Sequence, residues 1–353
     1  MEELEQAKPV NKKKSLRILI VIVILGLAVN LILPKMLDIG KAVDVLRTMT
    51  WGFVLAAFVS EVLCYISYGF SLESVLRIQR EEIGVVKSAL IFLSSYSVGV
   101  IAGGWVGSAA TTYGLFVDNG VKKSNALVAG LLPSMLANIP LVLIVMVGIA
   151  TLGFSGQLLR AQLIQYSIFI LLLLLFTFGF LLGLVFPKAA FKVVNWVLWN
   201  LNRIRKRPYN PARTQENLDR LFVSWRMMGK GRWRLPLLGT VGYYGFDLLM
   251  MYLIFRAAGY PIHVGVLFAG FGLPLLLAKM AFIVPGGVGV IETSMAALYS
   301  SLGVPESVAL VAIMGYRLIA FWIPLLLGLL SYVSITRKKV EKRIPDNVDV
   351  KET

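Results

Sequence analysis

Long apolar runs separated by short polar intervals dominate the pattern of this chain. Runs of membrane-spanning length predict helices over residues 16–33, 51–72, 125–152, 163–186, 235–255 and 307–335, because about 20 apolar residues cross the hydrocarbon core of a bilayer. Pro34 ends the first run and no A-x-A-like cleavage site follows it, which favours an uncleaved span over a signal peptide. The pattern predicts an all-α polytopic membrane protein with about six full spans.

Two further apolar stretches, residues 88–102 and 263–284, lead into glycine motifs and share a repeat. At a constant offset of 183 (286 − 103), ten of the 27 positions in 103–129 match their partners in 286–312, where composition alone would give about two or three matches. The matched pairs include Gly103/Gly286, Gly104/Gly287, Leu115/Leu298, Gly120/Gly303, Val121/Val304, Ser124/Ser307, Ala126/Ala309, Leu127/Leu310, Val128/Val311 and Ala129/Ala312. These matches predict an internal repeat.

The distribution of basic residues predicts the topology. Lysine and arginine are concentrated near the N-terminus, in the interval 187–234 and in the C-terminal tail, so we expect both termini and this interval to be cytoplasmic. Counting crossings from these ends then requires each glycine element to be a re-entrant helical hairpin, with its turn at membrane depth. The first hairpin would open to the cytoplasm and the second to the outside. We therefore expect one transmembrane domain, 1–353, with inverted repeat halves over about 47–152 and 230–335.

Composition and charge narrow the function classes. With 58% hydrophobic and 15% charged residues the chain is unlike a soluble domain, and its net charge of +16 is better explained by membrane topology and anionic lipid than by nucleic acid. The interval 187–234 has twelve basic and two acidic residues with four tryptophans, typical of a cytoplasmic interfacial segment. One cysteine, Cys64, and one histidine, His263, offer no disulfide framework, metal site, cofactor site or catalytic triad.

Charged residues inside apolar segments are costly and therefore informative. The second half contains Asp247, Lys279, Glu292 and Arg317 in such positions, and Glu61 is the buried acid of the first half. Lys279 precedes the hairpin turn and Glu292 follows it, so the two could face each other, with Arg317 within reach. Either these charges pair and only lock helices together, or Lys279 and Arg317 attract a phosphate while Glu292 tunes them or accepts a proton.

The glycines of the second motif belong to the same candidate site. Gly286 and Gly287 would permit a tight turn, and the helix behind them would aim free N–H groups at mid-membrane, as anion sites do. The spacing is not that of a nucleotide-binding loop, and no strand precedes it. For Asp247 and Glu61 we expect structural pairing or a cavity wall. The candidate lipid-headgroup residues are Lys279, Glu292, Arg317, Gly286, Gly287 and Asp247.

The last seventy residues resemble a known family. The segments that carry the resemblance are Pro285-Gly286-Gly287-Val288-Gly289-Val290-Ile291-Glu292, Leu302-Gly303-Val304, Tyr316-Arg317-Leu318, Phe321-Trp322-Ile323-Pro324 and Gly328. They are similar to the signature of the lysylphosphatidylglycerol synthase transmembrane region, also called the UPF0104 or flippase-like family. The resemblance implies a membrane part that moves an aminoacylated lipid between leaflets, joined in the full-length synthase to a soluble aminoacyltransferase domain. Around the first glycine motif, the chain departs from the family's usual proline, arginine and acidic residue.

The resemblance and the topology together give a functional expectation. We expect a lipid flippase of the cytoplasmic membrane, moving an anionic or aminoacylated phospholipid or a polyprenyl-phosphate lipid, without a cofactor. Since the sequence ends at Thr353, we expect no transferase domain and no lysyl-lipid synthesis by this chain alone. The alternatives are a phosphatidylglycerol lysyltransferase-type enzyme or its membrane subunit, and a scaffold for envelope glycosyltransferases. Expected partners are membrane lipid, a separate lipid-modifying or glycosyltransferase enzyme, and a second copy of the chain, with no nucleic acid.

Overall fold

The computed structural model describes residues 47–101, 104–154, 231–280 and 285–343, together with single positions elsewhere. All regular elements in these ranges are helices, as the apolar pattern predicts. Four helical stretches are long and apolar enough to cross a membrane, namely Trp51–Ile78, Lys123–Gly153, Arg234–Ala257 and Glu306–Ile335. They coincide with four of the six expected spans. The run 16–33 lies outside the described residues, and 163–186 and the basic interval 187–234 lie largely outside them.

The helices fall into two series with the same order. The first series consists of α3 (Trp51–Ile78), α4 (Val85–Ile101), α5 (Gly104–Asp118), α6 (Lys123–Leu136) and α7 (Asn138–Phe154). The second consists of α11 (Arg234–Ala257), α12 (Val264–Met280), the short 3₁₀ turn η2 (Pro285–Gly287), α13 (Val290–Ser301), α14 (Glu306–Arg317), the π-helical turn η3 (Leu318–Trp322) and α15 (Ile323–Arg343). Three pairs of helix boundaries, one member in each series, differ by 183, the offset of the repeat: 51 and 234, 118 and 301, and 123 and 306.

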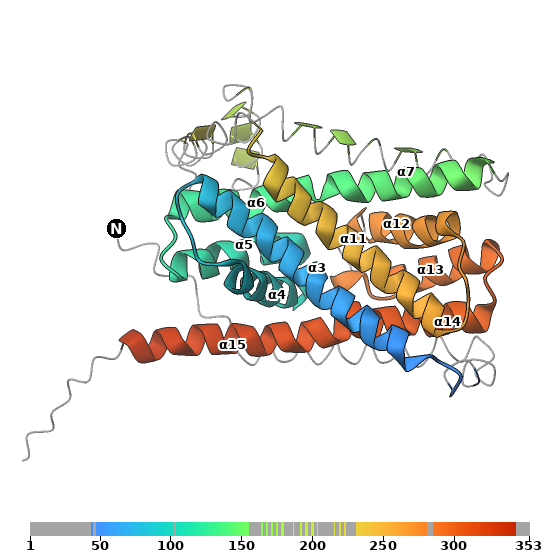
Figure 1. Ribbon diagram of the computed structural model, residues 1–353. Coiled ribbons are helices and arrows are strands. Elements are labelled where there is room, and N and C mark those ends of the chain that lie inside the picture. The colour runs from blue at the N-terminus through green and yellow to red at the C-terminus, as the bar shows by residue number, and fades with distance from the viewer. Residues whose placement is uncertain are drawn as a thin grey trace, which may run out of the picture.

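The first helices of the two series, α3 and α11, lie side by side and antiparallel (Figure 1). At one end the backbone N–H of Thr50 donates to the carbonyl of Ala257 at 2.9 Å. At the other end the hydroxyl of Ser71 donates to the carbonyl of Pro236 at 2.7 Å. Contact is close because Gly239 faces α3: an added Cβ would lie 2.7 Å from the carbonyl oxygen of Ser67. These two equivalent helices therefore run in opposite directions.

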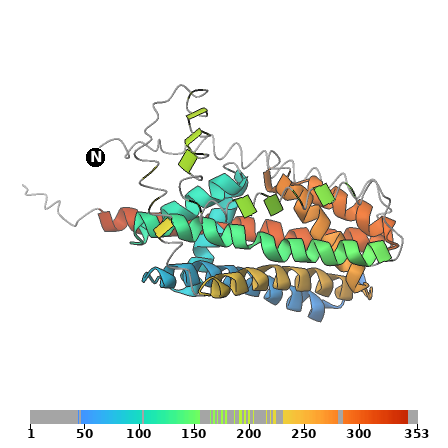
Figure 2. The same ribbon diagram turned by 90° about the horizontal axis from the view of Figure 1, so that it is seen from above.

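Each series covers the hairpin of the other with its last helix. In Figures 1 and 2, α7 extends over the region of α12 and α13, while α15 extends along α4. Gly148 of α7 meets α12 so closely that an added Cβ would lie 2.7 Å from the Cα of Ala269. On the other side, the Ser97 hydroxyl of α4 donates to the carbonyl of Pro324 in α15 at 3.2 Å. The two series therefore interlock and cannot be separate domains.

The helices of the two glycine elements are shorter than a typical membrane span. They have 17 and 15 residues in α4 and α5, and 17 and 12 in α12 and α13, whereas a span needs about 20. The equivalent glycines adopt the same left-handed backbone, with φ 64° at Gly104 and 62° at Gly287. This conformation strains residues that have a Cβ, which explains why the repeat keeps glycine there.

The last span of each series is interrupted at the same place. In the first series α6 ends at Leu136 and α7 begins at Asn138. In the second series the π-helical turn Leu318–Trp322 separates α14 from α15. Adding the offset to the first break gives 137 + 183 = 320, which falls inside that turn. Both interruptions lie close to a proline, Pro133 and Pro140 in one case and Pro324 in the other.

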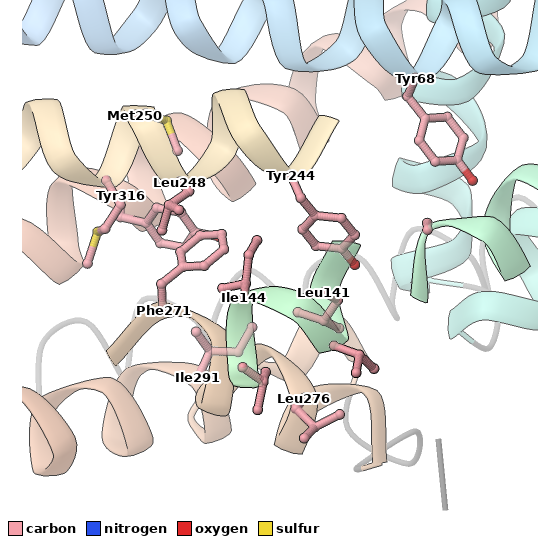
Figure 3. Packing of buried hydrophobic residues seen from close by; sticks show 14 of the residues in the cluster. Tyr68, Leu141, Ile144, Tyr244, Leu248, Met250, Phe271, Leu276, Ile291 and Tyr316 are labelled. Carbon is pink, nitrogen blue, oxygen red and sulfur yellow. The ribbon is translucent and has the colours of Figure 1, made fainter. Parts of the chain in front are cut away.

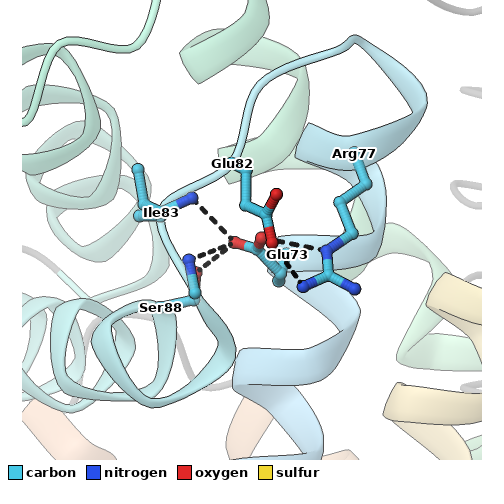
Figure 4. Close-up of polar contacts among 6 residues, drawn as sticks. Glu73, Arg77, Glu82, Ile83 and Ser88 are labelled. Atoms are coloured by element: carbon cyan, nitrogen blue, oxygen red, sulfur yellow. Dashed lines mark hydrogen bonds and ion pairs between the residues drawn. The ribbon is translucent and has the colours of Figure 1, made fainter.

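A buried carboxylate fixes the start of the first hairpin. Glu73, which is 1% exposed, accepts hydrogen bonds from the backbone N–H groups of Ile83 and Gly84, from the Ser88 hydroxyl and from Arg77 Nε, at 3.1–3.4 Å (Figure 4). These bonds satisfy free N–H groups at the beginning of α4. The equivalent position in the second series, 73 + 183, is Arg256. This anchor is therefore not repeated.

The main apolar core extends through both series, and one part of it lies where α7, α11, α12, α13 and α14 converge. Figure 3 shows side chains from each of these helices pointing into one volume, among them Ile144, Leu248, Phe271, Ile291 and Tyr316. The rings of Phe271 and Tyr316 meet edge to face with centroids 6.0 Å apart. This core holds the second hairpin against the first series, so that Glu292 of that hairpin lies inside the bundle.

The close contact of α3 with α11 gives a stability prediction. Gly239→Ala places a Cβ against the α3 backbone, and overpacking of this kind costs about 1–3 kcal/mol. Gly245→Ala on the same helix, where an added Cβ meets nothing within 4 Å, should leave stability unchanged or slightly raised. Thermal unfolding of the purified proteins measures the difference. Equal midpoints for the two variants would contradict the packing described here.

Candidate functional site

A buried ion pair ties the second hairpin to the last span. Glu292 lies in the first turn of α13, and its Oε2 accepts a hydrogen bond from the Gly289 N–H at 2.8 Å. Its Oε1 lies 2.7 Å from Nε of Arg317, and the two side chains are only 2% and 4% exposed. A carboxylate is stabilised at a helix N-terminus, and the adjacent guanidinium compensates its remaining charge. The ion pair fixes the angle between α13 and α14.

Arg317 also holds the glycine turn. A terminal nitrogen of its guanidinium donates to the carbonyl of Gly286 at 3.4 Å, and its Cζ lies 4.0 Å from the ring centroid of Phe321. Gly286 has φ 62°, and a Cβ there would lie 2.5 Å from the Phe321 ring. Gly287, the next residue, is buried. The turn, the π-helical segment and Arg317 therefore form one packed unit, and Gly286 cannot be replaced without disturbing it.

Lys279 is placed differently from the other charged residues. It lies in the last turn of α12, and its Nζ donates to Oδ1 of Asn138 at 2.7 Å and lies 5.8 Å from the Tyr244 ring centroid. The residue is exposed. In the described part of the chain no acidic side chain forms an ion pair with it. Glu292, which the sequence suggested could face Lys279 across the hairpin, is paired with Arg317 instead.

Asp247 and Glu61 meet at the contact of α11 with α3. Both residues are more than nine-tenths buried. The residues just before them bond across the same contact, where the Ser60 hydroxyl donates to the carbonyl of Phe246 at 2.8 Å. Within the described residues, Oε2 of Glu61 and Oδ1 of Asp247 have no hydrogen-bond partner. The sequence led us to expect pairing or a cavity wall at these positions, and the structure brings the two acids together.

These residues form one connected cluster. Lys279 lies over the Tyr244 ring, and Asp247 follows Tyr244 by three residues in α11. Tyr316 precedes Arg317 in α14, and Asn138 joins the first series to Lys279. The cluster thus extends from the second hairpin across α11 to the first series. No group of three or more potential metal-ligating acids, cysteines or histidines occurs within the described residues.

Sequence reasoning did not single out Asn138 or the tyrosines of the cluster. Asn138 is a polar residue within an apolar run, two positions before Pro140, and that combination signals a helix interruption with a polar side chain available. Tyr96 occupies the position equivalent to Lys279, since 96 + 183 = 279. Comparing the repeat position by position identifies both residues as candidates for the interior.

A bundle of apolar helices with a buried charged cluster defines a multi-pass membrane protein. The chain belongs to the family described as the lysylphosphatidylglycerol synthase TM region, which matches residues 15–328. The family resemblance expected from the glycine motif and the final span is therefore confirmed.

Three archaeal relatives carry the name UPF0104 membrane protein. The protein from Pyrococcus horikoshii is 38% identical over 92 residues, which cover 24% of this chain and 25% of the relative. The protein from Methanocaldococcus jannaschii is 26% identical over 138 residues, which cover 38% of this chain and 41% of the relative. The protein from Methanothermobacter thermautotrophicus is 26% identical over 164 residues, which cover 44% of this chain and 48% of the relative. The chain thus matches between a quarter and about half of the length of these relatives.

The buried ion pair gives a second stability prediction. Removing one member of such a pair leaves an uncompensated buried charge and costs about 3–5 kcal/mol, so Glu292→Gln and Arg317→Ala should each strongly lower the unfolding temperature. The double variant should be clearly more stable than the sum of the single losses predicts. Glu82→Gln, which breaks only the solvent-exposed pair of Glu82 with Arg77, should cost at most about 1 kcal/mol. Additive losses for Glu292 and Arg317 would contradict direct coupling.

Proposed function

We propose that this protein moves an anionic or aminoacylated phospholipid, or a polyprenyl-phosphate lipid, between the leaflets of the cell membrane. The observation that carries the proposal is Lys279, an exposed cation within apolar helices whose partners among the described residues are a neutral amide and an aromatic ring. Intramembrane charges that lack a counter-charge are expensive and mark substrate pathways. A lipid phosphate would supply the missing negative charge.

The surroundings of Lys279 favour an anion. Asn138, its hydrogen-bond partner, is the first residue of α7. The N-terminus of a helix carries a partial positive charge and free N–H groups, so it disfavours a lone ammonium group and favours an anion next to it. The exposed cation and the helix N-terminus therefore attract the same ligand. Arg317 contributes positive charge from deeper in the cluster, although Glu292 neutralises most of it.

The family supports a role with lipids. The description of the matching family refers to the transmembrane region of a synthase of lysylphosphatidylglycerol, a lipid with a cationic aminoacyl group and an anionic phosphate. We infer that Lys279 binds the phosphate, with Arg317, Glu292, Gly286 and Gly287 forming the wall behind it. Asp247 lies further along the cluster, where it could face an amino group or a proton.

We further infer that the two series are inverted halves, over about 47–152 and 230–335, and that each glycine element is a re-entrant hairpin. The antiparallel contact of α3 with α11 and the short hairpin helices support this arrangement. Inverted repeats with interrupted helices near mid-membrane are a design of secondary transporters, in which one half moves against the other around a central site. Both chain termini would then be cytoplasmic.

Accessibility of two equivalent positions tests this topology. Asp118 and Ser301 end α5 and α13, are exposed and differ by the offset of the repeat (301 − 118 = 183). In a Cys64→Ser background, we expect a membrane-impermeant thiol reagent to label Asp118→Cys only from the cytoplasm and Ser301→Cys only from outside. Labelling of both positions from the same side would contradict the inverted arrangement.

Lipid movement tests the function. Purified protein in liposomes should equilibrate headgroup-labelled phosphatidylglycerol and lysylphosphatidylglycerol between leaflets, and Lys279→Gln should slow this at least about tenfold, which corresponds to about 1.4 kcal/mol of lost interaction. Unlike Arg317→Ala, Lys279→Gln should leave the unfolding temperature nearly unchanged, because it breaks no ion pair. Lys87→Gln, an exposed cation in the first turns of α4, is the matched control and should transport at the wild-type rate.

The same preparation distinguishes the enzymatic alternative. If the protein moves no labelled lipid but forms lysyl-lipid when supplied with phosphatidylglycerol and charged lysyl-tRNA, the transporter proposal is wrong and the lysyltransferase reading replaces it. If Glu292→Gln and Arg317→Ala lower stability without changing the transport rate of the folded fraction, these two residues only lock the helices together. Loss of transport in the Lys279 variant alone would then confine the headgroup site to the end of α12.

A further inference from the structure

The contact of α3 with α11 contains two acids, Glu61 and Asp247, that take no part in the proposed binding of the phosphate by Lys279. Glu61 and Asp247 are 6% and 7% exposed, and one oxygen of each, Oε2 and Oδ1 respectively, lacks a hydrogen-bond partner among the described residues. Most buried carboxylates have such partners, as Glu73 does in this protein. Two buried carboxyl oxygens without a hydrogen-bond donor at the same helix contact therefore require another explanation.

A shared proton provides that explanation. Two carboxylates held together away from water cannot both remain ionised, because each disfavours the charge of the other. A protonated carboxyl group also acquires a donor, which can satisfy an acceptor that is otherwise left empty. A metal ion fits less well, since hard cations need about six oxygen ligands and the described residues contain no group of three potential metal-ligating side chains.

The neighbours of the pair do not supply a permanent counter-charge. Apart from Arg317, they are tyrosines and a cysteine, which are neutral at ordinary pH. The titratable and charged neighbours on the four packed helices are Cys64 and Tyr65 of α3, Tyr96 of α4, Tyr243 and Tyr244 of α11, and Tyr316 and Arg317 of α14. Arg317 already has Glu292 at 2.7 Å, so little of its charge remains for the pair.

A charge count connects the pair to the headgroup. The cluster has two cations, Lys279 and Arg317, and three acids, Glu292, Glu61 and Asp247. With one proton on the Glu61 and Asp247 pair, two positive and two negative charges remain and the cluster is neutral. An arriving phosphate monoanion adds one negative charge, and uptake of a second proton restores neutrality. Charge in a membrane interior is costly, so anion binding and proton binding should favour each other.

We propose that Glu61 and Asp247 form a proton-binding site that couples lipid movement to a proton gradient, with one proton taken up for each anionic headgroup. The coupling rests on the proposed function, but the bound proton does not. Phosphate and proton would cross together as an electroneutral pair. The acids lie at the α3–α11 contact, where the two series meet, so a change in their protonation acts on the surface along which the series would move.

Infrared difference spectroscopy tests for the proton without any transport. Wild-type protein in lipid at neutral pH should show the carbonyl band of a protonated carboxylic acid, and the band should be absent in the double variant Glu61→Gln, Asp247→Asn. Glu73→Gln is the matched control, because Glu73 is also buried but both of its oxygens accept hydrogen bonds, from backbone N–H groups, Ser88 and Arg77. A wild-type spectrum without the band, or a band that persists in the double variant, overturns the proton site.

Proteoliposomes with the membrane potential clamped test the coupling. For one proton per anionic headgroup, a gradient of one pH unit should drive about a tenfold asymmetry of labelled lipid between leaflets. Glu61→Gln and Asp247→Asn should still move lipid, but the ratio of labelled lipid between the two leaflets should stay near one. Glu73→Gln should behave as wild type. An asymmetry unchanged in both variants, or one driven by a sodium gradient at constant pH, overturns the coupling.

A negative result in one of the two experiments leaves the other informative. If wild-type protein moves no lipid at all, the proposed function is lost and the coupling with it, whereas the infrared band still decides whether the acids share a proton. If lipid moves and the band is absent, the function stands and this inference fails. Thermal unfolding of the double variant checks its fold, and we expect no loss of stability, because neutral amides replace an unsatisfied pair of acids.

Discussion

The structure depends on covering the ends of short helices. Four helices, α4, α5, α12 and α13, have 12 to 17 residues, fewer than the about 20 of a typical span, so the free N–H and carbonyl groups at their ends need partners within the protein. Protein must therefore surround them. The last helix of each series provides that cover for the hairpin of the other, and Arg317 and Glu292 bind the turn Gly286–Gly289 directly. The interlocking follows from this requirement.

The repeat was readable from the sequence because its glycines are required by the backbone. Gly104 and Gly287 share a left-handed conformation, and the positions of the long helices follow from apolar length. The partners of the charged residues were not readable. Lys279 meets Asn138 only because α7 crosses onto α12, and apolar length and local pattern do not encode that crossing. Arg317 was correctly expected to reach the turn, since its depth along the last span could be counted.

The two series carry unequal numbers of intramembrane charges, but the folded structure places residues of both series around these charges. In sequence, the second series carries most of the intramembrane charge, and its acids and cations correspond to smaller or neutral residues in the first: Cys64 for Asp247, Tyr96 for Lys279, Ala109 for Glu292 and Ser134 for Arg317. In space, the same charges contact the first series through Asn138, Glu61 and Tyr96. The cluster therefore belongs to both series, although one supplies most of its charge.

The matched interruptions of the two last spans have a mechanical consequence. In each span the part before the break packs within its own series and the part after it packs on the opposite hairpin. Any rotation of one series against the other must be absorbed between these parts, near Ala137 and within Leu318–Trp322. The two breaks are equivalent, so under the proposed transport mechanism they would serve as paired pivots. Opening the bundle toward one face of the membrane would then close it toward the other.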